Sequence, residues 1–105
     1  MTGGAFGAEA LAFLRQFRVS RAILSAAALG PDGIFLHDQS EAETGRAMAE
    51  QADDILIVAD GSKFHQSAPI RLCGWPNVSR LITDTAPPDA LASVLAANAV
   101  DVVRV

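Results

Sequence analysis

The chain has 105 residues, of which 50% are hydrophobic and 19% are charged, a balance that is typical of one globular domain and excludes a disordered segment. The formal net charge of −4 excludes the basic surface of a nucleic-acid-binding domain, so we expect no contact with nucleic acid through this chain alone. The single cysteine, Cys73, excludes an internal disulfide. Without a long apolar run or a signal peptide, the sequence predicts no membrane contact and a cytoplasmic location.

The first third of the chain is expected to form a helix and two strands. Apolar residues in 8–18 recur with a period of 3.6 residues, which predicts an amphipathic helix. The short apolar run 21–26 has the length of a strand. A turn follows at 30–33, where proline and glycine are favourable, and 34–36 is a brief second strand.

The middle of the chain contains the strongest strand. Asp38 or Ser40 can cap a helix that ends near Ala52. The next segment, 54–60, has four consecutive apolar residues, which is typical of a strand covered on both faces of a parallel sheet. After a loop, 69–75 is expected to be partly extended.

The remaining segments repeat the alternation of strand and helix. A strand is expected at 79–84, a proline-rich turn at 85–88, a helix at 89–99 and a final strand at 100–105. This alternation predicts a single α/β domain with a mostly parallel sheet flanked by helices, which is Rossmann-like.

Residues 60–63 are the first candidate binding site. Ligands of open α/β sheets gather beyond the carboxyl ends of the strands, and Asp60 and Gly61 stand at the end of the strongest strand. Ser62 offers a hydroxyl, and Lys63, which is the only lysine, offers an ammonium group suited to a phosphate or a carboxylate. The alternative is a solvated loop with an ordinary ion pair between the aspartate and the lysine.

Other polar residues are weaker candidates. His65 could lie at the rim of the same site, where a neutral imidazole can donate to ligand oxygens. Asp84 could face the same crevice or cap the turn that follows it. Because His37 and His65 lie on separate loops without further ligands near them, we expect no metal. The nucleotide-binding fingerprints are absent, and we expect no cofactor.

The sequence resembles the effector-sensing domain of DeoR-family transcriptional repressors over essentially its whole length. The resemblance is carried by "EAETGRAMAEQADDILIVADGSKF" (41–64), which contains the family's Asp-x-Ser-Lys-Phe motif, and by "RLITD" (80–84). It also includes "FGAEALAFL" (6–14), which is similar to the family's helix before the first strand.

This resemblance implies the fold of sugar-phosphate isomerases and CoA-transferases, and binding of a phosphorylated sugar as effector. Lys63 would contact the phosphorylated sugar, with Asp60 and Ser62 lining the pocket. The residues after the first strand, Ser25 and Ala26, would form another wall.

Family members also have an N-terminal winged helix-turn-helix and a Gly-Thr/Ser-Thr loop that binds phosphate. This sequence contains neither, so residues 1–105 are expected to form an incomplete sensor domain, with DNA binding left to the missing helix-turn-helix. Because the absence of a strand leaves a sheet edge uncovered, we expect a homo-oligomer, most simply a dimer.

Three functional hypotheses remain open at this point. The first is a non-catalytic sensor of a phosphorylated sugar or a related metabolite. The second is an enzyme of the sugar-phosphate isomerase or deaminase type, with Asp60 or Asp84 as general base. The third is an oligomerisation module that is derived from a sensor and binds no ligand.

Overall fold

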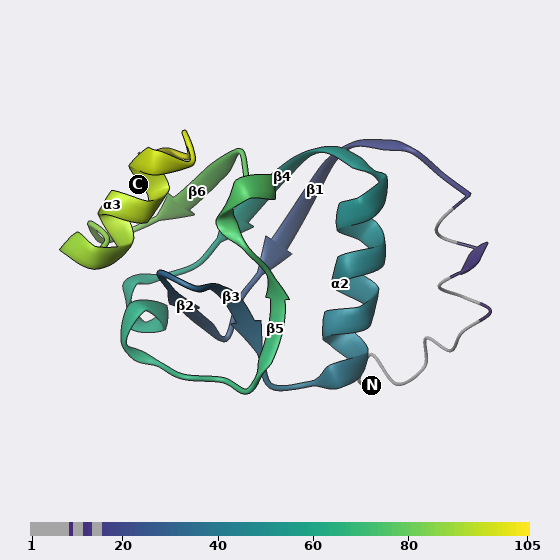
Figure 1. Cartoon of the computed structure of the whole chain (residues 1–105), viewed down its shortest axis with the longest axis horizontal. Helices are drawn as coiled ribbons and strands as arrows, with labels where there is room; N and C mark the ends of the chain where they lie inside the picture. Colours follow the sequence, from purple (N-terminus) through teal and green to yellow (C-terminus); the bar gives the residue numbers. More distant parts are fainter. Residues whose placement is uncertain (1–8, 10–11, 14–15) are drawn as a thin grey trace.

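The computed structural model describes residues 9, 12–13 and 16–105 of the chain (Figure 1). Strands and helices alternate through this part of the chain, as the sequence predicts. The elements in order are β1 (Val19–Ser25), β2 (Ala28–Gly30), β3 (Gly33–Leu36), α2 (Gln39–Gln51), β4 (Ala52–Val58), the 3-10 helix η2 (Gly61–His65), β5 (Ile70–Cys73), the 3-10 helix η3 (Trp75–Asn77), β6 (Arg80–Thr83), α3 (Asp89–Ala97) and β7 (Asp101–Arg104).

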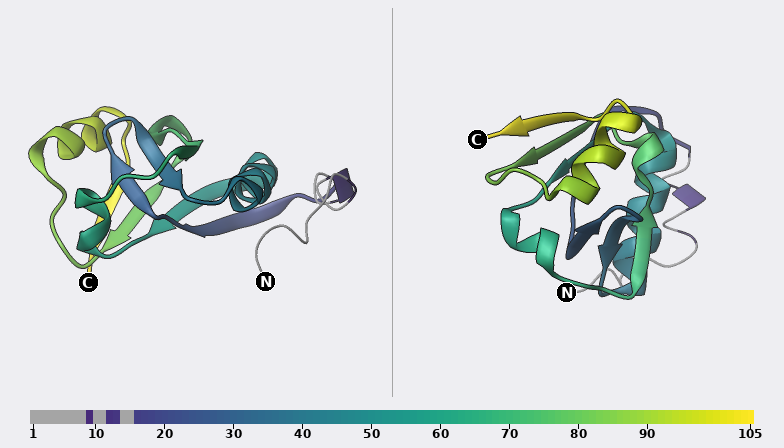
Figure 2. Two further views of the ribbon diagram at one scale, coloured as in Figure 1. Left: turned by 90° about the horizontal axis from the view of Figure 1, so that it is seen from below. Right: turned by 60° about the vertical axis from the view of Figure 1, so that its left-hand side comes forward.

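A four-stranded parallel sheet with the order β1-β4-β6-β7 confirms the predicted α/β class. Each successive strand is added at the same side of the sheet, from β1 to β7. Because crossovers between parallel strands are nearly always right-handed, the segments that connect these strands all lie on one face of the sheet. The exposure of the side chains agrees with this arrangement, because Ile57 and Leu81 on that face are fully buried in one cluster with Leu95 of α3. On the opposite face, Ile23 is 63% exposed and Val58 is 43% exposed. Figure 2 shows α2 lying along β1, and it shows β7 at the other edge of the sheet.

A second, antiparallel sheet with the order β2-β3-β5 was not predicted as a separate sheet. It contains both segments expected to be extended, 34–36 and 69–75, and adds the three-residue strand β2, which is too short to give a sequence pattern. The turn before β3 requires glycine, because Gly33 has φ = +135° and a Cβ there would lie 2.4 Å from the Cys73 carbonyl oxygen. This sheet fills the space beside α2 on the covered face of the main sheet.

Polar side chains cap both helices, and Asp38 does so as predicted. Asp38 caps α2 by accepting hydrogen bonds from the backbone N–H groups of Ser40 at 2.7 Å and Glu41 at 3.3 Å. Asn98 closes α3, and its side-chain amide donates to the Val94 carbonyl at 2.8 Å. These contacts fix where the chain leaves each helix and enters the next strand.

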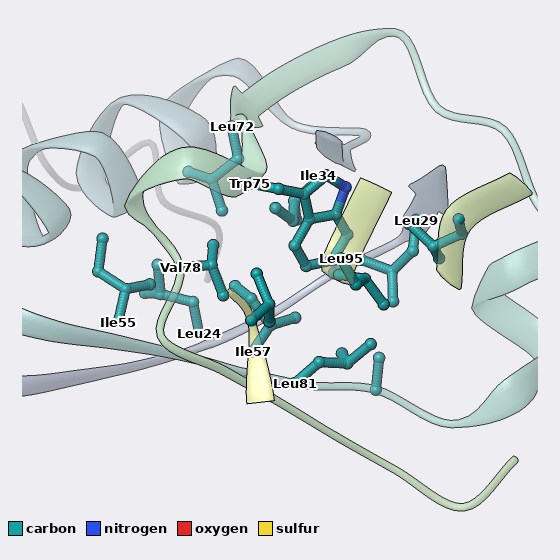
Figure 3. Packing of buried hydrophobic residues seen from close by; sticks show 14 of the residues in the cluster. Leu24, Leu29, Ile34, Ile55, Ile57, Leu72, Trp75, Val78, Leu81 and Leu95 are labelled. Carbon is teal, nitrogen blue, oxygen red and sulfur yellow. The ribbon is translucent and has the colours of Figure 1, made fainter. Parts of the chain in front are cut away.

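The core joins both sheets and both helices around Trp75 (Figure 3). Trp75 is 1% exposed, and its indole N–H donates to the Gly30 carbonyl of β2 at 2.8 Å. Ile34 of the small sheet and Ile57 of the parallel sheet are both fully buried in the same cluster. The small sheet is therefore an integral part of one core.

The predicted boundaries shift by one or two residues. The first strand begins at Val19 rather than at residue 21, and the strongest strand ends at Val58, so that Asp60 lies two residues beyond it. Most of the helix expected at 8–18 lies outside the described residues, although residues 9, 12 and 13 are helical. Among the described residues, no helix is long and apolar enough to cross a membrane.

Candidate functional site

The carboxyl ends of β1, β4 and β6 lie at one edge of the parallel sheet. The register pairs Ser25 with Val58 and Val58 with Ile82, so these three strands finish at nearly the same level. Asp60 follows β4 by two residues, and Asp84 follows β6 directly. The loop after β4 and the loop after β6 are therefore neighbours, as the parallel arrangement requires.

Asp60 shapes the loop after β4 by capping η2. Its carboxylate accepts the backbone N–H of Ser62 at 2.9 Å and also the Ser62 hydroxyl. The backbone carbonyl of Asp60 accepts the N–H of Lys63 at 3.1 Å. The first three residues of the Asp-x-Ser-Lys-Phe motif thus form a tight turn that fixes where the lysine side chain begins.

Asp84 connects the two loops. Its carboxylate accepts the Gly61 N–H at 2.8 Å and the Thr85 hydroxyl at 2.9 Å. The approach is so close that a Cβ on Gly61 would lie 2.3 Å from the Thr85 hydroxyl oxygen and 2.6 Å from its Cβ. The sequence left open whether Asp84 faces the crevice or caps the following turn, and its contacts with Gly61 and Thr85 include both loops. Sequence reasoning missed Thr85 as a contact residue, although it directly follows an aspartate at a strand end.

The last two residues of the motif have different environments, because Phe64 packs against the core and Lys63 lies nearer the surface. Phe64 is partly buried against the hydrophobic core and anchors η2, which also contacts β2. Lys63 is half-buried, and it forms no ion pair within the described part of the chain. His65 is exposed at the end of η2. The motif therefore holds one ammonium group at the edge of the sheet with an imidazole close to it in the chain.

Ser25 and Ala26 end up in different environments. Ser25 is exposed at the end of β1 and lines a cleft of about 310 Å³ that also contains Glu41 and Thr44 of α2. Ala26 is 8% exposed and belongs to the core, so it does not form the exposed pocket wall that the resemblance implies. The structure thus places Asp60, Gly61, Ser62 and Asp84 in one cross-braced pair of loops, with Ser25 on the adjoining strand end.

The remaining polar candidates lie elsewhere. In the described residues, no group of three histidine, cysteine or acidic side chains comes together as a metal site. Cys73 lines a separate cleft with Arg46 and Arg71, and burial raises the pKa of its thiol despite the two arginines. A raised pKa keeps the thiol protonated near neutral pH, so Cys73 is not an activated nucleophile.

The pKa of the Asp60 carboxyl lies below its usual value of 3.8, mainly because the hydroxyl and the backbone N–H of Ser62 donate to the ionised form. A lowered pKa in the folded state means that the loop contact is fully present above pH 3.8 and is lost as the pH falls through the folded-state value. We expect a carboxyl ¹³C NMR titration of Asp60 to have its midpoint below 3.8. Ser62→Ala should move it up towards 3.8, and an unshifted wild-type midpoint would contradict this assignment.

The chain is similar in sequence to known proteins over most of its length. The sequence model of the DeoR C terminal sensor domain matches residues 1–85. The chain is 34% identical over 101 residues, 95% of its length, to the HTH-type transcriptional repressor CsqR of Escherichia coli. It is 38% identical over 88 residues, 83% of its length, to the glycerol-3-phosphate regulon repressor of Haemophilus influenzae.

These alignments cover only part of the relatives. The chain spans 39% of CsqR and 34% of the Haemophilus influenzae protein. The matched region nevertheless includes the Asp-x-Ser-Lys-Phe motif and Asp84, whose carboxylate accepts the backbone N–H of Gly61 in that motif. The predicted resemblance is confirmed, and the chain belongs to the DeoR C-terminal sensor domain family.

Proposed function

We propose that this domain binds a phosphorylated sugar, or a related phosphorylated metabolite, reversibly at the carboxyl edge of the parallel sheet. The observation that carries the proposal is the position of Lys63, the only lysine of the chain, on a loop that is braced by two carboxylates. Its ammonium group acts on the nearby Asp60 carboxylate but forms no ion pair at contact distance within the described residues, so it can still approach a phosphate. His65, two residues further on, can donate to ligand oxygens through its imidazole, whereas the Ser62 hydroxyl already donates to Asp60.

The two carboxylates at this edge support binding rather than catalysis. A general base needs a pKa near the working pH, whereas hydrogen bonds from Ser62 lower the pKa of Asp60. Asp84 accepts hydrogen bonds from Gly61 and Thr85, which hold the two loops together. Both acids therefore have a structural task, and we propose that the bound metabolite leaves unchanged.

The relatives support a role in transcriptional regulation. One of them is named for a glycerol-3-phosphate regulon, and glycerol-3-phosphate is a phosphate ester. We propose that ligand binding to this domain alters DNA binding by a helix-turn-helix that is no part of residues 1–105. A net charge of −4 is consistent with such a division of tasks.

Isothermal titration calorimetry with matched pairs of phosphorylated and unphosphorylated sugars tests this proposal. At least one phosphorylated sugar should bind saturably, and its unphosphorylated partner should bind more weakly by about tenfold or more, because a charge-assisted contact is lost. Equal affinity within each pair would contradict a phosphate-directed site. Deuterium transfer from D₂O into the bound sugar, observed by NMR, would show catalysis instead.

A further inference from the structure

A second cleft lies at the amino end of β4, away from the loops that hold Lys63. It has a volume of about 600 Å³ and lies between the last turns of α2 and the end of β5, two elements that are side by side in Figure 1. Ala52 and Asp53 at the start of β4 line this cleft, whereas Lys63 and Asp84 do not. A cleft of this size is in the range that holds small metabolites.

Two arginines from different elements line this cleft. Arg71 of β5 is held by the turn before β3, because its Nε donates to the Asp32 carbonyl at 3.0 Å. One of its terminal nitrogens lies so close to Gly74 that a Cβ there would be 2.6 Å away from it. Arg46 of α2 is half-buried and donates to the backbone carbonyl of Arg71. Backbone carbonyls therefore hold both side chains near the end of β5.

Neither guanidinium group is paired with an acid of residues 1–105. Among the described residues no carboxylate forms an ion pair with Arg46 or Arg71, and the remaining residues contain no aspartate or glutamate. Of the two acids that line the cleft, Asp53 is paired with Arg18, and Glu50 is not within ion-pair distance of Arg46. A guanidinium has several N–H donors, so donors remain at both arginines for a ligand.

We propose that this cleft binds a small metabolite through a phosphate group that lies between Arg46 and Arg71. A phosphate dianion matches two guanidinium groups in charge, and the planar fork of each arginine can donate to two phosphate oxygens at once. Buried Ile55 and Leu72 provide an apolar floor for the rest of the ligand, and Asn77 adds an exposed amide. This site is separate from the one proposed at Lys63 and does not depend on it.

Cys73 is a local reporter for this cleft. It is the only cysteine of the chain, and it is half-buried among the lining residues. Burial raises the pKa of its thiol, and the positive charges of Arg71 and Arg46 act in the opposite direction. A phosphate bound to the two arginines would offset these charges and cover the sulfur, so it should slow every reaction of the thiolate.

Alkylation of Cys73 by iodoacetamide, followed by intact-protein mass spectrometry, tests the site with inorganic phosphate as the probe. Phosphate should slow the reaction saturably by about threefold or more, whereas sodium chloride at the same ionic strength should not. Sodium acetate should protect less than phosphate, because acetate carries a single charge. Arg46→Gln should remove the effect of phosphate and keep the wild-type circular dichroism spectrum, since it removes one exposed hydrogen bond.

Arg80→Gln is the matched control, because it removes an exposed guanidinium that is paired with Asp101 and lies outside the cleft. It should keep the protection of Cys73 by phosphate, and so should Lys63→Ala, which separates this cleft from the proposed effector site. An alkylation rate that does not depend on phosphate, or equal protection in Arg46→Gln, would overturn the proposal. Loss of protection in Lys63→Ala would also overturn it, because the phosphate would then act from the other site. Equal protection by acetate would overturn the assignment of a phosphate group.

Discussion

Replacing Trp75 by alanine is expected to lower the free energy of unfolding by about 3–5 kcal/mol, the usual cost of removing a buried large aromatic side chain. Trp75 is 1% exposed in the cluster that joins the small sheet to the parallel sheet, and its indole donates to Gly30 of β2. The variant loses both the packing and the hydrogen bond that fastens β2. Urea denaturation followed by far-ultraviolet circular dichroism measures the change, because the only tryptophan is removed.

Trp75→Phe is the matched variant for separating these two effects. It keeps most of the apolar volume and removes the indole N–H, so the Gly30 carbonyl loses its 2.8 Å partner. We expect it to cost about 1–3 kcal/mol, less than the alanine variant. If both variants had the stability of the wild type, the small sheet would not share one cooperative core with the parallel sheet.

Replacing Lys63 by alanine is expected to weaken binding of the best phosphorylated ligand by about 10- to 100-fold, which corresponds to about 1.5–3 kcal/mol for a hydrogen bond to a charged group. The side chain is half-buried and has no ion pair within the described residues, so its loss should cost the fold little. Calorimetric titration of the wild type and the variant gives the ratio of dissociation constants.

Arg80→Ala is the control for the general effect of losing one positive charge. Arg80 begins β6, at the opposite end of the sheet from Lys63, and its ion pair with Asp101 at 3.2 Å is exposed. Its removal should change ligand affinity by less than about threefold, because exposed charges are screened over such distances. If Lys63→Ala behaved like Arg80→Ala, Lys63 would not be the phosphate contact.

The braced loops explain why Lys63 is the informative residue of its motif. Asp60 and Asp84 both accept backbone N–H groups, so replacing either one should disturb the loop itself. A loss of binding in those variants would therefore not identify a ligand contact. Lys63 follows the turn that these acids fix and precedes Phe64, which is anchored in the core.

Several elements could be predicted from local sequence because local chemistry decides them. The consecutive apolar residues of 54–60 predicted the strand β4, and Asp38 predicted a helix start, since strand propensity and capping depend on residues close in the chain. The same holds for Lys63 and Asp60, which were recognised as strand-end residues of a known motif. The expected coverage of β4 on both faces is only partial, because Leu56 is buried but Val58 is 43% exposed on the second face. The predicted ends of the strands differ from the observed ends by one or two residues, because pairing with neighbouring strands decides where each strand stops.

The α/β class, the parallel strands and the motif that holds the only lysine could all be predicted from the sequence. Only the tertiary structure showed the separate antiparallel sheet, since β2 has three residues and pairs through backbone groups that every sequence carries. Only the structure showed that Thr85 packs against Gly61 and that the Asp84 carboxylate accepts the Gly61 N–H. These contacts join two loops that are more than twenty residues apart in the chain. Such contacts depend on the packing of distant strands, and neither periodicity nor local propensity records that packing.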